Sequence, residues 1–347
     1  MVQLVPLDPD KDWRVELARA PTSIGELRYL LKLPKALGDD NSHADFPLRV
    51  PLSYIRRIEA GNPSDPLLLQ ILPQAQEAVQ NGSPWGQLDP LREQLQQPVQ
   101  GVISKYAGRV LWMLSGACPI HCRYCFRRHL PYSEMTASIR GADQVLDWLA
   151  DNPQVTEVIF SGGDPLSLPD RVLSPLVERL AAIDHIRTLR IHTRFPVVIP
   201  QRVNQELIDW VARCKKQFDH GLVMVLHLNH AQEIDEDFAQ AIQLLRQAGV
   251  RLYAQSVLLA GVNDSSDSLS QLFERMWQLE IQPYYLHLLD PVQGTRHFDL
   301  PQWRAQLLYG EVCSRLPGYL IPKLVRETPG LPSKTLIPPS FATHTSC

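Results

Sequence analysis

Long apolar runs are missing from this chain. No stretch approaches the roughly 18 to 20 consecutive apolar residues that a membrane-spanning helix requires. An excess of charge is also missing, because 34 Lys and Arg against 37 Asp and Glu leave a net charge of −3, and such a protein has no general attraction to nucleic acid or to an anionic membrane. The N-terminus carries Asp8 and Asp10 where a signal peptide would carry positive charge and an apolar stretch. We therefore expect a soluble, cytoplasmic protein with no nucleic-acid or membrane partner.

Lysine is scarce, and this scarcity limits the amine chemistry that the chain can perform. Among 347 residues only eight are lysines, at positions 11, 32, 35, 105, 215, 216, 323 and 334. A reaction that needs a lysine amine as a nucleophile therefore has few candidates.

Six cysteines are present, and three of them form a tight Cys-x3-Cys-x2-Cys group at Cys118, Cys122 and Cys125. Thiolates are ligands of soft metals, and this spacing lets one loop wrap a single centre. A structural zinc needs a fourth ligand, which His121 could supply only by folding back, and a disulfide is not expected in an intracellular chain. The group therefore favours a 4Fe–4S cluster, with one iron left open, over zinc. The cysteines with no expected role in metal binding are Cys214, Cys313 and Cys347.

The chain divides into three parts by pattern. Residues 1–100 are rich in proline and glutamine and show short helical patterns, for example at 23–31, but no strand. Residues 101–315 alternate short apolar runs with helical patterns, which is typical of βα units on a parallel sheet. Residues 316–347 form a proline-rich tail that we expect to lie across the sheet.

Six βα units in a row predict an α/β fold, a partial (β/α)6 TIM-type barrel preceded by a helical N-terminal region. No expected strand is followed by a Gly-x-Gly-x-x-Gly turn, so a dinucleotide-binding fold is not supported. The expected strands are 110–115, 157–160, 188–192, 222–228, 252–258 and 284–289. The expected helices are 139–151, 170–182, 204–216, 233–248, 266–279 and 301–315. Because the loops after the strands of such a barrel build its active site, the polar residues there should share one mouth.

The cysteine group, with Tyr124 before its last cysteine, resembles the radical S-adenosylmethionine (SAM) superfamily. The segment 161–166 (SGGDPL) resembles the glycine-rich loop of that superfamily, which contacts the methionyl amine. More narrowly, roughly residues 100 to 337 resemble lysine 2,3-aminomutases. The segments that carry this resemblance are 106–111, 125–128, 190–194, 255–264 and 284–290.

The resemblance implies that the open iron binds SAM beside the glycine-rich loop. Ser161, Gly162 and Gly163 would let the backbone approach the cofactor, Asp164 would meet its ammonium group, and Gln255 would lie nearby. A tight strand-to-helix turn would require the same glycines without any cofactor.

Pyridoxal 5′-phosphate is the further cofactor that the resemblance implies, because an amine shift needs a group that carries the nitrogen. Lys334 stands where the family has the lysine that binds this cofactor covalently, although the glycine-rich run before it is reduced to Gly-Leu-Pro-Ser. Lys323 is the nearby competitor, and the alternation around it points it towards solvent. Lys105 and Arg109 match two basic positions just before the first barrel strand and would hold the cofactor phosphate.

The substrate is implied by charge. Arg127 matches the arginine that would pair with the substrate carboxylate, and Asp290 and Glu327 occupy two acidic places that would hold an ε-ammonium group. A glutamate aminomutase would need a cation there, so two acids favour L-lysine.

We therefore expect an isomerase that converts (S)-α-lysine to (R)-β-lysine with the help of a reducing electron donor. The chain ends soon after Lys334, without the extension of free-standing aminomutases. In this it resembles the bacterial enzyme that makes (R)-β-lysine for elongation factor P, and this factor or its lysyl ligase is an expected partner. The alternatives are a free-standing aminomutase that makes β-lysine as a metabolite, and a non-enzymatic iron–sulfur or zinc protein.

Overall fold

The computed structural model describes residues 12–39, 46–78, 85–136 and 141–341. In its first part, short helices follow capping residues: the Asp12 carboxylate accepts a hydrogen bond from the backbone of Arg14, and the Ser23 hydroxyl accepts one from Glu26. The helices are α1 (Trp13–Ala18), α2 (Ile24–Leu30), α3 (Leu52–Ile55), α4 (Pro66–Leu69), and the 3-10 turns η1 (Ala75–Ala78) and η2 (Glu93–Gln96). The helix expected at 23–31 is thus confirmed as α2.

Among the described residues, one sheet of nine strands follows in sequence order, with β1 and β9 at its edges. From β2 to β8, each strand is parallel to the next. The two edge pairs, β1 with β2 and β8 with β9, are antiparallel. The strands are β1 (Val102–Tyr106), β2 (Arg109–Ser115), β3 (Glu157–Gly162), β4 (Thr188–Thr193), β5 (Gly221–His227), β6 (Arg251–Val257), β7 (Gln282–His287), β8 (Lys323–Arg326) and β9 (Thr335–Leu336).

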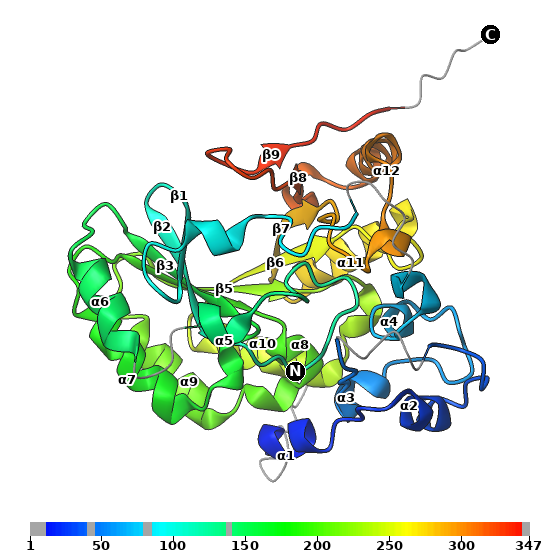
Figure 1. The fold of residues 1–347 in the computed structure, drawn as a ribbon, viewed down its shortest axis with the longest axis horizontal. Helices are drawn as coiled ribbons and strands as arrows, with labels where there is room; N and C mark the ends of the chain where they lie inside the picture. Colours follow the sequence, from blue (N-terminus) through cyan, green and yellow to red (C-terminus); the bar gives the residue numbers. More distant parts are fainter. Residues whose placement is uncertain (1–11, 40–45, 79–84, 137–140, 342–347) are drawn as a thin grey trace.

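Helices separate the parallel strands and cover the outer side of the sheet, where α6, α7 and α9 lie in a row (Figure 1). The helices are α5 (Tyr132–Met135), α6 (Ala142–Ala150), α7 (Asp170–Ala181), α8 (Phe195–Val198), α9 (Gln205–Cys214), α10 (Glu236–Gln247), α11 (Ser266–Gln278) and α12 (Gln302–Arg315). This alternation confirms the partial α/β barrel, and the six expected strands correspond to β2 to β7. Helix α6 begins at Ala142, and the part of the expected helix at 139–140 lies outside the described residues.

Three strands were not predicted. Strand β1 forms a hairpin with β2, so Lys105 lies within a strand and not before the first one. Strands β8 and β9 lie in the proline-rich tail, which joins the sheet instead of only crossing it. These strands contain between one and three apolar residues each, which is too few to identify a strand from the sequence.

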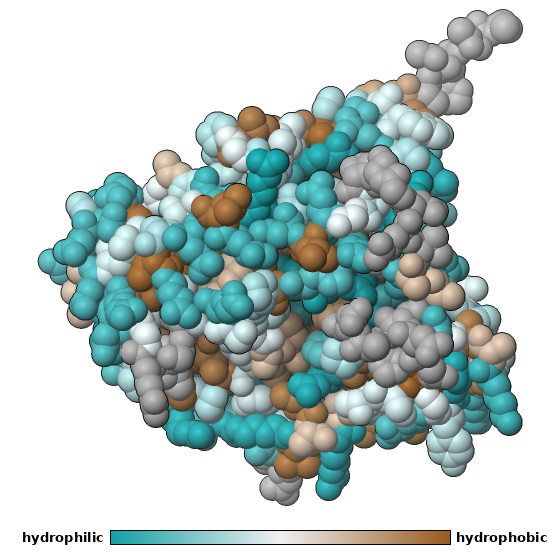
Figure 2. All heavy atoms as spheres, in the orientation of Figure 1, coloured by the Kyte–Doolittle hydropathy of each residue, from teal (hydrophilic) through white to brown (hydrophobic). Residues whose placement is uncertain are grey.

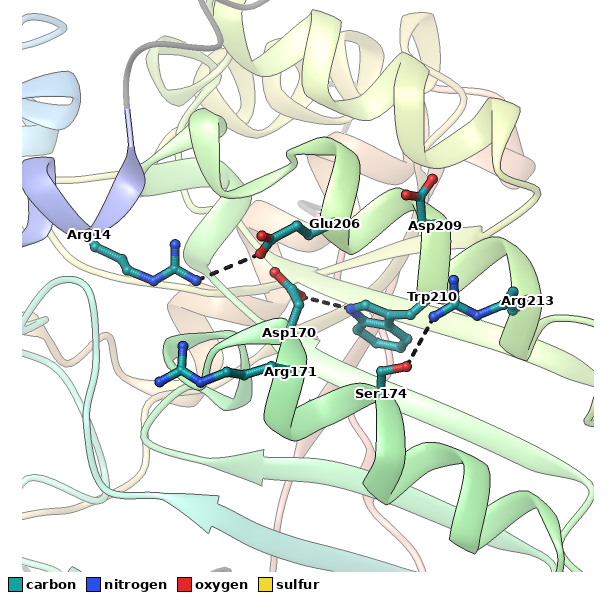
Figure 3. Close-up of a pocket in the computed structure, with 8 residues that line it drawn as sticks. All are labelled: Arg14, Asp170, Arg171, Ser174, Glu206, Asp209, Trp210 and Arg213. Atoms are coloured by element: carbon teal, nitrogen blue, oxygen red, sulfur yellow. Dashed lines mark hydrogen bonds and ion pairs between the residues drawn. The ribbon is translucent and has the colours of Figure 1, made fainter.

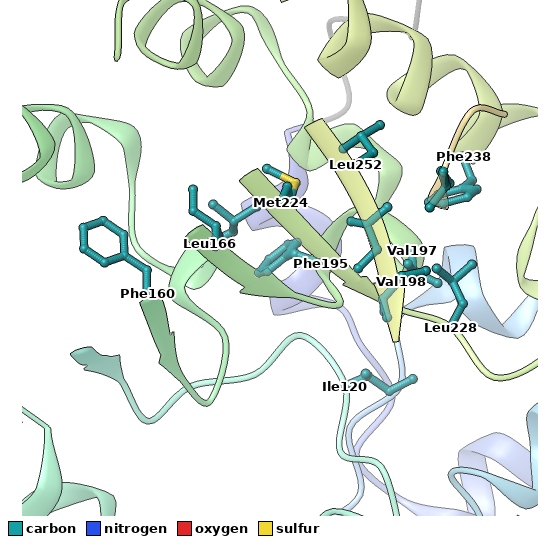
Figure 4. Packing of buried hydrophobic residues seen from close by; sticks show 14 of the residues in the cluster. Ile120, Phe160, Leu166, Phe195, Val197, Val198, Met224, Leu228, Phe238 and Leu252 are labelled. Atoms are coloured by element: carbon teal, nitrogen blue, oxygen red, sulfur yellow. The ribbon is translucent and has the colours of Figure 1, made fainter. Parts of the chain in front are cut away.

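The core continues from the barrel into the N-terminal region. Figure 4 shows Phe160, Phe195 and Met224 from neighbouring strands and loops packed among aliphatic side chains. Trp13 of α1 belongs to the same buried cluster and meets the ring of Phe195 edge-on, with 5.2 Å between ring centroids. The face of the molecule in Figure 2 is mostly hydrophilic, with scattered hydrophobic residues. No helix in the described part of the chain is long and apolar enough to cross a membrane.

A buried ion pair ties the loop after β3 to the loop after β4. Asp170 accepts hydrogen bonds from Arg202 Nη1 and Nη2 at 2.9 and 2.8 Å and from Trp210 Nε1 at 2.7 Å. Arg202 also donates from Nε to the carbonyl of Leu166, and none of its side chain is exposed. Asp170 and Trp210 border a surface pocket of about 340 Å³ between α1, α7 and α9, on the outer side of the barrel (Figure 3).

Replacing Asp170 by Ala should lower the free energy of unfolding by about 3–5 kcal/mol, because the guanidinium of Arg202 would stay buried without a counter-charge. Urea denaturation of the full chain measures this. The matched control is Asp143→Ala, which breaks the exposed pair between Asp143 and Arg179 and should cost less than about 1 kcal/mol. Equal destabilisation by both variants would contradict the structural role assigned to Asp170.

Candidate active site

The three clustered cysteines lie in the loop that follows β2. This loop is held by the N-terminal region, because the backbone of Arg123 donates to the Gln70 carbonyl at 2.8 Å and its buried guanidinium pairs with Glu77. Cys118, Cys122 and Cys125 are free thiols. Burial raises the pKa of Cys118 well above its ordinary value and that of Cys125 to about 11. These thiols would therefore lose their protons when they bind a metal centre, because the positive charge of the metal stabilises the thiolate.

The donor set fits an iron–sulfur cluster better than zinc. Among the described residues, no three His, Cys, Asp or Glu side chains converge closely enough to hold a single metal ion. A cubane places each cysteine ligand on a different iron, so its thiolates do not have to meet at one point. His121, the conceivable fourth zinc ligand, instead bonds through Nδ1 to the Pro47 carbonyl at 2.7 Å and stacks on the ring of Phe46.

The glycine-rich segment packs against the start of the cysteine loop. The backbone of Gly163 donates to the carbonyl of Ser115 at 2.7 Å, and that of Asp164 donates to the carbonyl of Ala117 at 2.8 Å. Gly162 has φ +124°, and a Cβ on it would overlap the Ser115 carbonyl oxygen. These glycines are thus required because their backbone packs closely against residues 115–117 of the same chain. Contact of this segment with SAM stays a prediction.

Asp164 joins the loops after β3 and β4. Its carboxylate accepts hydrogen bonds from Thr193 Oγ1 at 2.8 Å and from the backbone of Arg194 at 2.7 Å. The backbone groups of Leu166 and Phe195 donate to it as well. Burial raises the pKa of Asp164 to about 6, and these donors oppose the rise. A cofactor ammonium, which the sequence analysis assigned to Asp164, would have to compete with these donors.

A chain of buried ion pairs lines the mouth of the barrel, and we call it the charge chain. It consists of Arg127, Glu93, Lys105, Glu327 and Lys334, in that order. Glu93 Oε2 and Oε1 lie 2.6 and 2.8 Å from Arg127 Nε and Nη2, and Oε1 also lies 2.8 Å from Lys105 Nζ. Lys105 Nζ then lies 2.7 Å from Glu327 Oε1, whose other oxygen pairs with Lys334. Three cations against two anions leave one positive charge.

The two glutamates of the charge chain are firmly ionised. Burial alone would raise the pKa of Glu93, but Arg127 and Lys105 outweigh it and lower that pKa to about 2. Burial likewise opposes ionisation of Glu327, yet Lys334 and Lys105 hold its pKa well below the ordinary value. Four of the predicted site residues are therefore already paired: Arg127 with Glu93, and Glu327 with Lys105 and Lys334. Lys105, expected to hold a phosphate, holds two carboxylates instead.

Asp290 lies beside the charge chain without joining it. Within the described part of the chain, its half-buried carboxyl group has no hydrogen bond or ion pair. Burial, followed by the negative charge of Glu327, raises the pKa of Asp290 to about 7, while Lys334 and Lys105 act in the opposite direction. This carboxyl group is therefore available to a cation that enters the mouth.

Lys334 and Lys323 differ in solvent exposure: Lys334 is half-buried, and Lys323 is exposed as expected. The Lys334 ammonium pairs with Glu327 and lies 5.9 Å from the ring centroid of Tyr285 on β7. Its charge also lowers the pKa of His192 on β4 and of His287 on β7, after the effect of burial. Lys334 thus faces the inside of the barrel, whereas Lys323 at the start of β8 is exposed.

Two arginines lie near Tyr285. Arg109, a predicted phosphate ligand, sits over the ring of Tyr106 at 4.8 Å. Arg190 on β4 donates from Nη2 to Glu157 at 2.8 Å, and its buried Nε has no partner among the described residues. Both arginines act against the rise in the pKa of Tyr285 that burial causes. Arg190 and Lys334 also both lower the pKa of His192, after the effect of burial, and a cation with an unused donor such as Arg190 suits a phosphate group.

Gln255, the remaining predicted residue, is half-buried on β6 between His227 on β5 and Tyr285 on β7. Cys214 and Cys313 lie on α9 and α12, and Cys347 lies outside the described residues. Sequence reasoning missed Glu93, because no local pattern marks a single glutamate in a proline-rich segment. It also gave no role to Arg190, although Arg190 belongs to one of the segments that carry the resemblance.

Known proteins resemble the chain over nearly its whole length. It is 44% identical to L-lysine 2,3-aminomutase of Escherichia coli strain K12 over 94% of each chain. It is 42% identical to the L-lysine 2,3-aminomutase of Haemophilus influenzae over 96% of this chain and 99% of that one. For the L-lysine 2,3-aminomutase of Clostridium subterminale the identity is 32%, over 95% of this chain and 78% of that one. Residues 112–272 match the Radical SAM superfamily. The chain therefore belongs to the L-lysine 2,3-aminomutase family of radical SAM enzymes.

Proposed function

We propose that the protein converts (S)-α-lysine to (R)-β-lysine by moving the amino group from C2 to C3 and a hydrogen from C3 to C2. The observation that carries this proposal is the half-buried carboxyl group of Asp290, which has no partner among the described residues and lies beside a charge chain that already binds lysine ammonium groups. A mouth of this kind suits a substrate that has an ammonium group at one end and a carboxylate at the other. Membership of the family supports the same reaction and argues against a non-enzymatic metal protein.

The residues present fit the three cofactors. The cluster with SAM supplies the radical, and pyridoxal phosphate carries the migrating nitrogen. Cys118, Cys122 and Cys125 would hold the cluster, with the segment 161–164 and Gln255 on the side of SAM. Lys334 would hold pyridoxal phosphate, and Arg109 with Arg190 would take its phosphate. Lys105 is connected to Lys334 through Glu327, which pairs with both lysines.

The chain's own residues would bind the two ends of lysine separately. Asp290 and Glu327 supply the negative charge for the ε-ammonium group, and Glu327 already holds the ammonium groups of Lys105 and Lys334. Arg127 remains our proposal for the carboxylate. Its Nη1, which meets the Ser161 hydroxyl at 3.0 Å and the Gly162 carbonyl at 3.3 Å, is the part of the guanidinium that Glu93 does not use.

We also propose that the product serves elongation factor P, with a reducing protein as the electron donor. This destination rests on the sequence resemblance described above. Adding purified elongation factor P, its lysyl ligase and the chain's reaction product should yield the factor enlarged by one lysine residue's mass, and free (S)-α-lysine should be a poorer substrate in that coupled reaction.

The activity itself is tested by anaerobic incubation of the reconstituted protein with L-lysine, SAM, pyridoxal phosphate and dithionite. Chromatography should show β-lysine. Cys122→Ala should abolish the reaction, because two thiolates cannot hold the cluster with a defined open iron, while Cys214→Ala should leave it close to the parent. If Cys122→Ala kept its iron and its full turnover, the assignment of the cluster ligands would be wrong. If the parent protein formed no β-lysine, the proposed function would be wrong.

Asp290→Asn should raise KM for lysine about ten- to a hundredfold, because a charge-assisted partner worth roughly 1.5 to 3 kcal/mol is lost. In the parent, kcat/KM should fall as the pH drops through about 7, since Asp290 with its raised pKa becomes protonated and neutral below that pH. The variant should lack this limb of the pH profile. Asp299→Asn is the matched control, because its carboxyl group faces Arg326 and Arg296 instead of the charge chain. Normal lysine binding by Asp290→Asn would place the ammonium group elsewhere.

Lys334, and not Lys323, should carry pyridoxal phosphate. Borohydride reduction of the loaded protein followed by peptide mass mapping should add the pyridoxyl mass to the peptide containing Lys334. Lys334→Ala should remove the modification, whereas Lys323→Ala should retain it, because Lys323 is exposed at the start of β8. Modification of Lys323, or of neither lysine, would refute the assignment.

A further inference from the structure

A buried arginine reaches one of the three clustered thiols. Arg194 follows β4, and its backbone is fixed by the hydrogen bond to Asp164. Its guanidinium donates from Nη1 to Cys122 Sγ at 2.6 Å and also to the hydroxyl of Tyr124. Only 7% of its side chain is exposed. One cysteine sulfur is thus in direct contact with a positive charge that solvent hardly reaches.

A carboxylate lies directly behind this arginine. Arg194 Nη2 pairs with Glu233 and donates to Gln70 Oε1 at 2.8 Å. Glu233 is fully buried, and its second oxygen accepts the backbone groups of Asn229 at 2.6 Å and His230 at 3.0 Å. Sulfur, cation and anion therefore form a row whose members are fixed by the loops after β2, β4 and β5.

Stability does not by itself explain this row. A buried ion pair gains little over apolar packing, since both ions lose their hydration. Glu233 already supplies the counter-charge of Arg194. The hydrogen bond from Arg194 to Cys122 is therefore not needed to neutralise the arginine. Hydrogen bonds and charges around ligating sulfurs are among the features that set the potential of an iron–sulfur cluster.

We propose that Arg194 and Glu233 set the reduction potential of the cluster held by Cys118, Cys122 and Cys125, an inference that rests on the cluster of the proposed function. Reduction adds one electron from the donor and makes the cluster more negative by one charge. Arg194, acting as a positioning residue through Cys122, stabilises the reduced state and raises the potential. Glu233 lies behind Arg194 and acts in the opposite direction.

The two residues therefore predict shifts of opposite sign, which a merely structural role would not produce. The full chain is reconstituted with iron and sulfide and titrated anaerobically with dithionite, with the midpoint potential followed by visible absorption and electron paramagnetic resonance. Arg194→Met should move the midpoint to a more negative potential, and Glu233→Gln should move it to a more positive one. Arg194→Lys, which keeps the charge, should lie between Arg194→Met and the parent.

The matched control is Tyr54→Phe, which removes a buried hydroxyl 3.5 Å from Arg194 Nη2 without changing any charge and should leave the midpoint in place. If Arg194→Met fails to fold, Arg194→Lys and Glu233→Gln decide the question. Shifts of equal sign, or no shift in either charge variant, would overturn the inference while leaving the proposed function intact. A parent protein that binds no cluster at all would instead overturn the proposed function.

Discussion

Two buried glutamates hold the mouth of this barrel together, because each of them neutralises two cations that the fold removes from water. Glu93 comes from the N-terminal region and joins Arg127 of the cysteine loop to Lys105 of β1. Glu327 comes from the turn after β8 and joins Lys105 to Lys334. Among the described residues, loss of Glu93 would leave Arg127 without a counter-charge, and loss of Glu327 would leave Lys334 without one. The positions of Arg127, Lys105 and Lys334 at the mouth thus depend on these contacts.

The repeating part of the fold could be predicted from the sequence, whereas the contacts between distant segments could not. Strands β2 to β7 are apolar runs separated by amphipathic helices, and their order places the cysteines, Asp290 and the glycine-rich segment at one end. Strands β1, β8 and β9 were missed because their apolar content is short and their pairing partners are decided by the tertiary structure. Glu93 could not be found, since an isolated glutamate becomes informative only when the fold brings it to two cations.

The same limit applies to the roles of predicted residues. Lys105, Arg127 and Asp164 were predicted to bind a phosphate, a carboxylate and an ammonium group, and each of them is engaged by the protein itself. The carboxylate of Asp164 accepts backbone donors that fix the loop after β4, and Arg127 and Lys105 share Glu93. The family resemblance therefore pointed to this region of the fold. The hydrogen bonds of the structure then distinguish the residues that are already paired from Asp290, whose carboxyl group has no partner among the described residues.

The two edges of the described sheet are connected at the mouth by side chains. In this part of the chain, β1 and β9 share no backbone ladder, and Lys105 and Tyr106 on β1 both contact Glu327, which also pairs with Lys334 beside β9. The backbone ladders of β2 to β8 and the apolar core beneath them do not include this seam. On that side the described sheet is therefore joined by charge between side chains, whereas its neighbouring strands are joined by backbone hydrogen bonds.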